Sequence, residues 1–289
     1  MPEADVLITP DLVRALLAAQ HADLATRPLA DAGEGWDNRQ FRLGADLAVR
    51  LPRRAAAASS IQHEQQWVPR LAPRLPVPVP TPVRVGRPGC GFPWAWSIVP
   101  WFDGHIAAPP GADSLVEGIA GFLLALHQPA PADAPVNVHR ASLASRSDRF
   151  AMHVAGLDGT FDRLALTAAW EAALTPPTWA GPPLWLHGDL HPANLIVRGE
   201  RLHAVIDFGD VTSGDPAVDL AVAWMLWPEP ARRRFRDVID SASRWTDEAT
   251  WRRARGWALA FGLALAATAD DHPVMRAIGC RTIGEVLAE

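Results

Sequence analysis

The sequence predicts an α+β protein with two lobes, a small sheet-rich N-terminal lobe and a larger helical C-terminal lobe. Strand-like alternation dominates residues 28–51. Apolar residues recur at helical spacing along most of the chain after residue 104. One polar stretch, at about residues 184–210, interrupts this helical part. We therefore place the N-terminal lobe at residues 1–102 and the C-terminal lobe at residues 103–289.

The N-terminal lobe is expected to begin with a helix and to continue with strands. Thr9 and Pro10 precede a helical pattern, and a capping hydroxyl followed by a first-turn proline favours a helix start. Two short strands then follow, joined at Gly44, and the second runs from Leu47 to Leu51.

A second helix and a proline-rich connector complete the predicted lobe. Ser59 and Ser60 predict a helix start, and the helical pattern continues to about Leu71. Seven prolines within residues 69–88 exclude a long helix and indicate an extended connector. Residues 93–102 are then expected to form a strand that ends in a kink.

The C-terminal lobe is predicted to consist mainly of helices. Ser114 is expected to cap the first of them, because it precedes a run of apolar residues that share one helical face. Further helical patterns lie at about residues 142–155, 163–174, 216–227, 230–243, 247–269 and 273–288.

The basic residues of the chain exclude several enzyme classes. The 289 residues carry a net charge of −5, and all 27 basic residues are arginine. A Walker-type phosphate loop, a Schiff-base lysine and a Ser-x-x-Lys hydrolase all need a lysine, so none of them is possible here. The acidic balance, with no basic tract, also argues against a nucleic-acid partner.

Cysteine usage and apolar runs indicate a cytoplasmic protein without a membrane partner. Cys90 and Cys280 are far apart, which predicts neither a disulfide framework nor a zinc ribbon. The N-terminus lacks the pattern of a signal peptide. The longest apolar run, residues 256–269, is 14 residues long, shorter than the ~20 that span a bilayer. We expect it to form a buried helix.

The polar stretch holds the candidate chemistry. Asp189 and Asn194 lie five residues apart in a loop between two apolar strands, and Asp207 begins an Asp-Phe-Gly turn after the second strand. Phosphoryl transfer uses such a set, since one carboxylate orients the acceptor hydroxyl while a second carboxylate and an amide oxygen hold magnesium. Asp189 is the candidate for the first role, and Asn194 with Asp207 for the second.

The motifs His187–Asn194, Ile206–Asp210 and Gly214–Ala221 together resemble the aminoglycoside phosphotransferase family. That family has the protein-kinase-like fold, with His-Gly-Asp-x-x-x-x-Asn where kinases have His-Arg-Asp-x-x-x-x-Asn. The resemblance implies a magnesium-dependent phosphotransferase that uses ATP or GTP and an alcohol acceptor. It also implies that a buried Asp219 braces the loop backbone. For His187 we expect a supporting role, in which it stabilises the loop by hydrogen bonding.

Three neighbours of Asp189 and Asp207 have alternative interpretations. His187 and His191 flank Asp189 and suggest a metal-hydrolase site, but Pro192 breaks the helix that would put both histidines on one face. Asp210 is either a supporting group behind the site or a solvated turn residue.

For the N-terminal lobe the resemblance implies a nucleotide site. Arg50 on a predicted strand and Glu64 on the next helix match the basic and acidic pair that holds the phosphates, with arginine in place of lysine. The alternative is a surface ion pair of small energetic value. At the hinge, adenine would accept from the backbone N–H of Phe102 and donate to the carbonyl of Pro100.

Two further features lie near this proposed nucleotide site. The turn Gly33–Asn38 is a candidate for the loop that covers the phosphates, although its Gly-x-Gly pattern is unspecific. Trp36 and Trp101 are the tryptophans close to the site, whereas most others have the spacing of core residues.

Charge provides the one indication of the acceptor. Eleven arginines against nine acids give residues 1–102 a charge of +2, and 16 against 23 give residues 103–289 a charge of −7. An acidic lobe suits a cationic aminosugar, with Asp162, Asp270 and Asp271 as candidate contacts, and antibiotic resistance as the associated role. Macrolide, choline or homoserine kinases and a nucleotide-binding pseudokinase are the alternatives, and the choice between monomer and dimer stays open.

Overall fold

The computed structural model describes residues 3–268 and 272–289, and the chain divides into two compact units. Unit 1 contains the chain up to Pro73 together with Pro78–Asp103 and Ile206–Gly209. Unit 2 contains Arg74–Val77, Gly104–Val205 and Asp210–Glu289. The Asp-Phe-Gly turn thus belongs to unit 1, although most of the surrounding chain belongs to unit 2.

Unit 1 is built on an antiparallel sheet of five strands in the order β1-β2-β3-β5-β4. The central strand β3 is buried along its whole length, and Arg50 on it is paired with Gln40 and Ser97 on its two neighbours. The strands are β1 Leu29–Glu34, β2 Asn38–Leu43, β3 Leu47–Pro52, β4 Arg84–Gly86 and β5 Trp96–Pro100. The predicted strand pair joined at Gly44 is confirmed, and this glycine has a φ of +69°.

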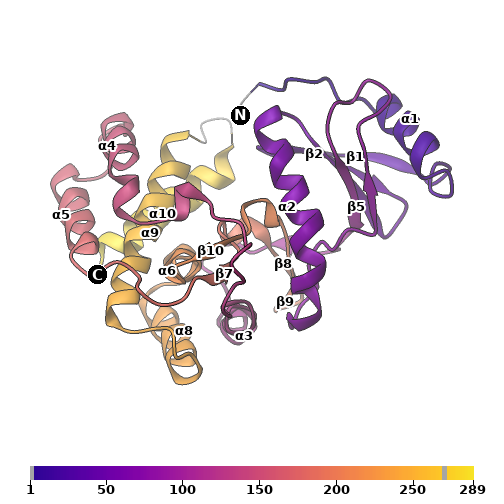
Figure 1. Cartoon of the computed structure of the whole chain (residues 1–289). Coiled ribbons are helices and arrows are strands. Elements are labelled where there is room, and N and C mark those ends of the chain that lie inside the picture. Colours follow the sequence, from indigo (N-terminus) through magenta and orange to yellow (C-terminus); the bar gives the residue numbers. More distant parts are fainter. Residues whose placement is uncertain (1–2, 269–271) are drawn as a thin grey trace. The chain divides into compact units, whose positions relative to one another are not determined.

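Two helices accompany this sheet, α1 Pro10–Gln20 and α2 Ala55–Leu71. The predicted cap of α1 is confirmed, because the Thr9 hydroxyl accepts a hydrogen bond from the Leu12 N–H at 3.2 Å. Helix α2 packs on β3 and β5 (Figure 1).

The predicted start of α2 at Ser59 and Ser60 is wrong, because the helix begins four residues earlier. The Ala55 N–H donates to the Asp5 side chain at 2.8 Å, so a carboxylate 50 residues away satisfies the first turn. Local sequence carries no sign of such a distant partner.

Unit 2 is mainly helical, and its predicted helices are largely confirmed. They are α3 Val116–Leu126, α4 Ser147–Gly156, α5 Arg163–Leu174, α6 Ala217–Leu220, α7 Val222–Leu226, α8 Glu229–Ala242, α9 Glu248–Thr268 and α10 Pro273–Leu287. The predicted cap at Ser114 is wrong. A 3₁₀ turn precedes α3, and the Ser114 hydroxyl donates to the Glu200 carbonyl at 2.6 Å instead.

Helix α9 is the central element of unit 2 and packs against α4, α5, α6, α7 and α10 (Figure 1). Its residues Trp257, Leu259 and Leu263 are at most 1% exposed. The described part of the apolar run, residues 256–268, therefore belongs to a helix with a buried face, as expected. Over the residues that the structure describes, no helix combines the length and apolarity needed to cross a membrane.

Short strands frame the loop that carries Asp189 and Asn194 in unit 2. Strand β7 Leu184–Leu186 pairs with β10 Thr212–Gly214, and β8 Leu195–Arg198 pairs with β6 His105–Ile106 and β9 Arg201–Val205. The loop from His187 to Asn194 is thus held by one strand at each end.

Candidate active site

A glycine allows the tight start of the catalytic loop. Gly188 has a φ of +83°, and a Cβ atom there would lie 2.2 Å from the carbonyl oxygen of Asp210. A side chain would therefore meet both unfavourable backbone geometry and another backbone segment.

The Asp219 carboxylate binds backbone N–H groups at the start of this loop. Its carboxylate is fully buried and accepts the N–H groups of His187 and Gly188 at 2.8 and 2.9 Å. His127 Nε2 lies 3.2 Å from it. Burial raises the pKa of Asp219, but His127, His187 and the Gly188 N–H outweigh this effect and hold the pKa below its usual value. Asp219 is consequently ionised at neutral pH.

Asp189 is the carboxylate that this loop presents. Its side chain is 37% exposed, with Oδ1 3.2 Å from the Arg140 Nη2 and Oδ2 3.5 Å from the His191 Nε2. Burial raises its pKa, but hydrogen bonding and charge from His191, and then the charges of Arg140 and His187, bring the pKa well below the usual value. An ionised, partly exposed carboxylate is able to accept a hydrogen bond from a hydroxyl group.

Asn194 lies beside Asp189 and closes the loop. Its amide nitrogen donates to the Asp189 carbonyl at 2.9 Å and lies 3.2 Å from the His191 Nε2. Its amide oxygen accepts no hydrogen bond from any residue that the structure describes, and so remains available as a ligand. In the described part of the chain, no three His, Cys, Asp or Glu side chains gather around a common metal position.

Arg140 is the site residue that sequence reasoning missed. It ends a 3₁₀ turn, Val138–Arg140, and donates from Nε to the Gly188 carbonyl at 2.5 Å. Its guanidinium lies over the Phe261 ring at 4.7 Å. It also lies 3.4 Å from Asp210, which makes Asp210 a partner of the site and not merely a solvated turn residue. Its sequence neighbourhood contains no motif that would have identified it.

In unit 1 the Arg50 and Glu64 side chains form a buried ion pair. They are 4% and 1% exposed, and the Arg50 Nη1 bonds both carboxylate oxygens of Glu64 at 3.0 and 2.9 Å. The alternative of a surface ion pair is therefore wrong. The Arg50 Nη2 bonds the Asp207 Oδ1 at 3.0 Å, so one guanidinium serves two carboxylates.

Arg50 and Glu64 differ in how firmly each holds its charge at neutral pH. Burial lowers the pKa of Arg50, but the charges of Glu64 and Asp207 outweigh it and raise the pKa. Burial also raises the pKa of Glu64 to about 7, although Arg50 opposes the shift. Arg50 is thus the permanently charged member, while Glu64 is close to its titration point at neutral pH.

Asp207 has an unusual backbone conformation. Its φ is +63°, which is uncommon for a residue other than glycine, although Asp adopts it more readily than most. Residues in such strained conformations cluster at functional sites. The side chain is 48% exposed. One oxygen bonds Arg50, and the other accepts no hydrogen bond from the residues that the structure describes.

The predicted hinge residues lie at the end of the unit 1 sheet. Pro100 ends β5 opposite Leu47, and Phe102 follows two residues later, with both side chains half-buried. The Trp101 indole between them donates to Asp103 at 3.0 Å, and the Arg42 guanidinium lies 5.0 Å from it.

The predicted turn at Gly33–Asn38 joins β1 and β2 as a hairpin. The Gly35 N–H donates to the Asn38 carbonyl at 2.8 Å, which closes the turn between β1 and β2. The Arg53 side chain donates to the Gly35 carbonyl at 3.1 Å. Trp36 at the tip is 48% exposed.

The acidic residues expected to meet the acceptor receive no support from the structure. Asp162 caps helix α5 by accepting the Leu164 N–H at 2.8 Å. Asp270 and Asp271 lie outside the described residues.

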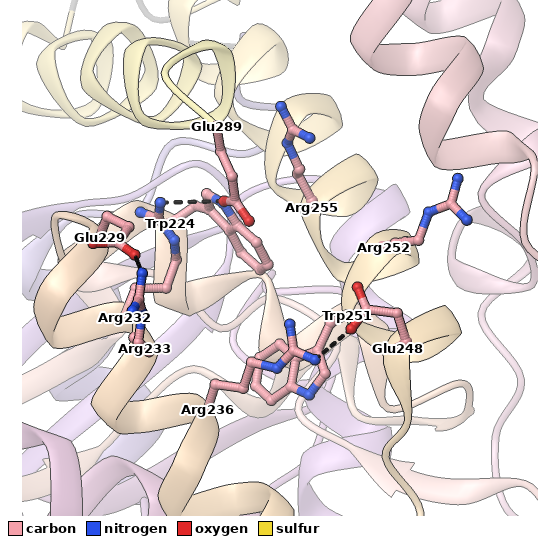
Figure 2. Close-up of a pocket in the computed structure, with 10 residues that line it drawn as sticks. All are labelled: Trp224, Glu229, Arg232, Arg233, Arg236, Glu248, Trp251, Arg252, Arg255 and Glu289. Atoms are coloured by element: carbon pink, nitrogen blue, oxygen red, sulfur yellow. Dashed lines mark hydrogen bonds and ion pairs between the residues drawn. The ribbon is translucent and has the colours of Figure 1, made fainter.

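A cavity of about 430 Å³ lies elsewhere in unit 2, between α7, α8, α9 and the C-terminal residue (Figure 2). The guanidiniums of Arg232 and Arg236 lie over Trp224 and Trp251 there. Arg232 also forms an ion pair with Glu289 at 3.2 Å. None of the predicted site residues lines this cavity.

Comparison with known families and structures gives a consistent result. A sequence model of the phosphotransferase enzyme family matches residues 28–257. No curated protein matches the chain significantly.

Solved structures of similar fold come from antibiotic phosphotransferases. The GDP complex of aminoglycoside 2′-phosphotransferase-IIIa is 19% identical, with a TM-score of 0.70 over 96% of this chain and 97% of that one. The GDP and kanamycin complex of APH(2″)-IIia is 20% identical, with a TM-score of 0.72 and coverages of 96% and 98%. A macrolide 2′-phosphotransferase from Brachybacterium faecium is 23% identical, with a TM-score of 0.64 and coverages of 95% and 98%. These likenesses establish the α+β kinase-like fold.

Proposed function

The chain belongs to the phosphotransferase enzyme family, and we propose that it transfers the terminal phosphoryl group of ATP or GTP to a hydroxyl group of a small molecule. The observation that carries the proposal is the loop in unit 2, where an ionised and partly exposed Asp189 stands beside Asn194 on a backbone held by Asp219. That arrangement supplies the base and one ligand oxygen that phosphoryl transfer requires.

Asp189 is proposed to orient the acceptor. Its carboxylate would accept a hydrogen bond from the acceptor hydroxyl, align the oxygen for attack on phosphorus and take the proton as the new bond forms. The low pKa of Asp189 keeps the carboxylate ionised for the first of these tasks. His187 and Asp219 would act indirectly, since they hold the loop backbone.

Unit 1 is proposed to bind the nucleotide. Arg50 is a fixed cation suited to phosphate oxygens, and its bonds to Glu64 set its orientation. The Pro100 carbonyl and the Phe102 N–H would contact the base at the hinge. Residues 1–102 thus form the proposed nucleotide lobe, and residues 103–289 the catalytic and acceptor lobe.

Asn194 and Asp207 are the proposed magnesium ligands. Asn194 and Asp207 each keep one oxygen that accepts no hydrogen bond from the described residues, and Mg²⁺ prefers carboxylate and amide oxygens. When bound, the ion would neutralise charge on the phosphates.

For the acceptor we propose an antibiotic-type small molecule, with aminoglycosides as the first class to test. Solved relatives of similar fold include complexes with kanamycin and gentamicin, and macrolide kinases form the second class. Choline and homoserine kinases are further alternatives. The last alternative is a pseudokinase that binds nucleotide without catalysis. The presence of Asp189, Asn194 and Asp207 argues against it.

The test is nucleotide consumption with Mg²⁺ over a panel of aminoglycosides, macrolides and small alcohols. We expect Asp189→Asn to bind nucleotide like the wild type while turnover falls by about 10²–10⁴-fold, the contribution of a positioned base. Asp133→Asn, at an exposed residue of unit 2, is the control and should leave turnover unchanged. Turnover that survives in Asp189→Asn would remove Asp189 from the mechanism.

A further inference from the structure

A group of cations lies next to the catalytic loop in unit 2. Arg140 is the cation of this group that contacts the loop. It donates to the Gly188 carbonyl, and its Nη2 lies 3.2 Å from the Asp189 carboxylate. Six residues later along the chain, Arg146 ends a second 3₁₀ turn that leads directly into helix α4.

Arg146 is buried without a partner. Five arginines are buried among the described residues, and four of them bond carboxylates: Arg50 with Glu64, Arg53 with Glu34, Arg232 with Glu285 and Arg253 with Asp215. The Arg146 side chain belongs to a residue that is 7% exposed, and it forms no ion pair and no hydrogen bond with any described residue. A buried guanidinium is costly unless something pairs with it, so the missing partner points to a ligand.

The terminal nitrogens of Arg146 remain within reach of a ligand. Only the Nε atom is fully enclosed without a hydrogen-bond partner. The two Nη atoms are not among the enclosed atoms, although the residue as a whole is buried. They are the atoms that bind carboxylate or phosphate oxygens in two parallel hydrogen bonds.

The surroundings of Arg146 are cationic as well. Arg149 and His153 follow it by three and seven positions, so all three lie on one helical face. Arg149 is exposed and forms no ion pair with a described residue. The His153 side chain is 7% exposed and its ring forms no hydrogen bond with a described residue. Burial, and then Arg146 and Arg149, lower the pKa of His153, so at neutral pH its ring is uncharged and offers one N–H donor. Burial, and then Arg140 and Arg149, lower the pKa of Arg146 to about 10. Arg146 thus stays charged at neutral pH.

We propose that Arg146, together with Arg149 and His153, forms a subsite for an anionic group, a carboxylate or a phosphate, on the acceptor that Asp189 orients. The proposal rests on the proposed function, because it assigns the subsite to the phosphoryl acceptor. The nucleotide phosphates are assigned to Arg50 in unit 1, so this second set of cations serves the other substrate.

The subsite reverses the expectation drawn from net charge. Residues 103–289 are acidic in total, which favoured a polycationic aminosugar, but the charges that act on Arg146 are those of Arg140 and Arg149. A cationic group placed beside Arg146 would be repelled. Among hydroxyl compounds, those that carry a carboxylate or a phosphate fit this face better.

The test uses inorganic phosphate and succinate as probes of the full-length protein. The nucleotide site is first saturated with a non-hydrolysable ATP analogue and Mg²⁺, so that Arg50 does not bind the probe. Each anion is then titrated by calorimetry in a buffer without competing oxyanions. Binding of phosphate alone would indicate a phosphorylated acceptor, and binding of succinate alone a carboxylic acid.

We expect saturable binding of at least one probe to the wild type. Arg149→Gln should weaken it about tenfold, since one charge-assisted contact is lost, and Arg146→Gln should abolish it. Arg198→Gln, at an exposed and unpaired arginine of unit 2, is the matched control and should bind like the wild type. Because Arg149 is exposed, its variant keeps the test valid even if Arg146→Gln does not fold.

Failure of the subsite and failure of the proposed function give different results. Nucleotide binding without any saturable anion binding, or equal anion affinity in wild type and Arg149→Gln, overturns the subsite alone. Anion binding that depends on Arg149, in a protein that does not bind the nucleotide analogue, overturns the proposed function and with it the assignment of this anion site to a phosphoryl acceptor.

Discussion

Arg50 combines two tasks that a lysine would perform less well. Its planar guanidinium bonds both oxygens of Glu64 through one nitrogen and Asp207 through another. An ammonium group offers a single charged centre without this fixed fork. In a chain that contains no lysine, arginine at this position retains the charge and adds a second fixed contact.

We expect Arg50→Ala to weaken ATP or GTP binding by at least tenfold, because the cation for the phosphates is lost. It should also lower the free energy of unfolding by about 3–5 kcal/mol, since a buried carboxylate is left without its partner. Calorimetry with nucleotide and denaturant unfolding measure the two effects. The double variant Arg50→Met with Glu64→Gln is the control and should recover much of the stability without the affinity. Normal affinity in Arg50→Ala would leave Arg50 a purely structural residue.

Asp219 gives a prediction that depends on pH. Its pKa is held below the ordinary value of 3.8 in the folded protein, so its contribution to stability is complete above that value and is lost as the pH falls through the folded pKa. We expect Asp219→Asn to be less stable by about 2–4 kcal/mol at pH 7, because one backbone N–H of the loop loses its acceptor. Urea unfolding at several pH values should show the difference shrinking below pH 4. A difference that is constant with pH would contradict the charge argument.

At the scale of elements, the close contact between α9 and α10 requires a glycine at position 279. A Cβ atom at Gly279 would lie 2.6 Å from the Ala266 backbone nitrogen and 2.7 Å from the Gly262 carbonyl oxygen. Both contacts are with backbone, which cannot move aside cheaply.

We expect Gly279→Ala to lower the free energy of unfolding by about 1–3 kcal/mol, the usual cost of overpacking. Gly284→Ala in the same helix is the matched control. A Cβ there meets nothing within 4 Å, so the better helix former should stabilise the protein by about 0.5–1 kcal/mol. Thermal unfolding distinguishes the two, and equal effects of the two substitutions would contradict the close helix contact.

Sequence patterns predict the boundaries of several helices correctly. Helix α5 begins and ends at the predicted residues, and α8, α9 and α10 agree within one residue, because helical periodicity and local caps are visible along the chain. Helix α4 begins at Ser147, after a 3₁₀ turn, and not at about residue 142 as predicted. The wrong helix starts at Ser59 and Ser114 have a common cause. Asp5 and Glu200 lie 50 or more residues away from their partners, and local patterns do not reveal partners at that distance.

At the scale of the whole molecule, nucleotide binding should be linked to folding. Each unit has its own buried core, and the proposed nucleotide contacts of unit 1 exist only when it is folded. We expect ATP with Mg²⁺ at a hundred times its Kd to raise the free energy of unfolding by about 2.7 kcal/mol. Scanning calorimetry with and without nucleotide measures this gain.

Two variants test whether the stabilisation by nucleotide depends on Arg50. Asp189→Asn should keep it, because Asp189 is proposed to contact only the acceptor. Arg50→Ala should lose most of it at the same nucleotide concentration. A gain of equal size in both variants would show that the nucleotide does not bind through Arg50.

The fold class, the family and the loop that carries Asp189 and Asn194 can be predicted from the sequence, because they depend on residue type and short spacing. The contact between Arg140 and Asp189 cannot be predicted in this way, because the two residues are 49 positions apart along the chain. The isolation of Arg146 was equally invisible, since a charge is unpaired only with respect to everything folded around it. Local spacing specifies elements and motifs, whereas the electrostatic environment of a site is set by contacts between distant segments.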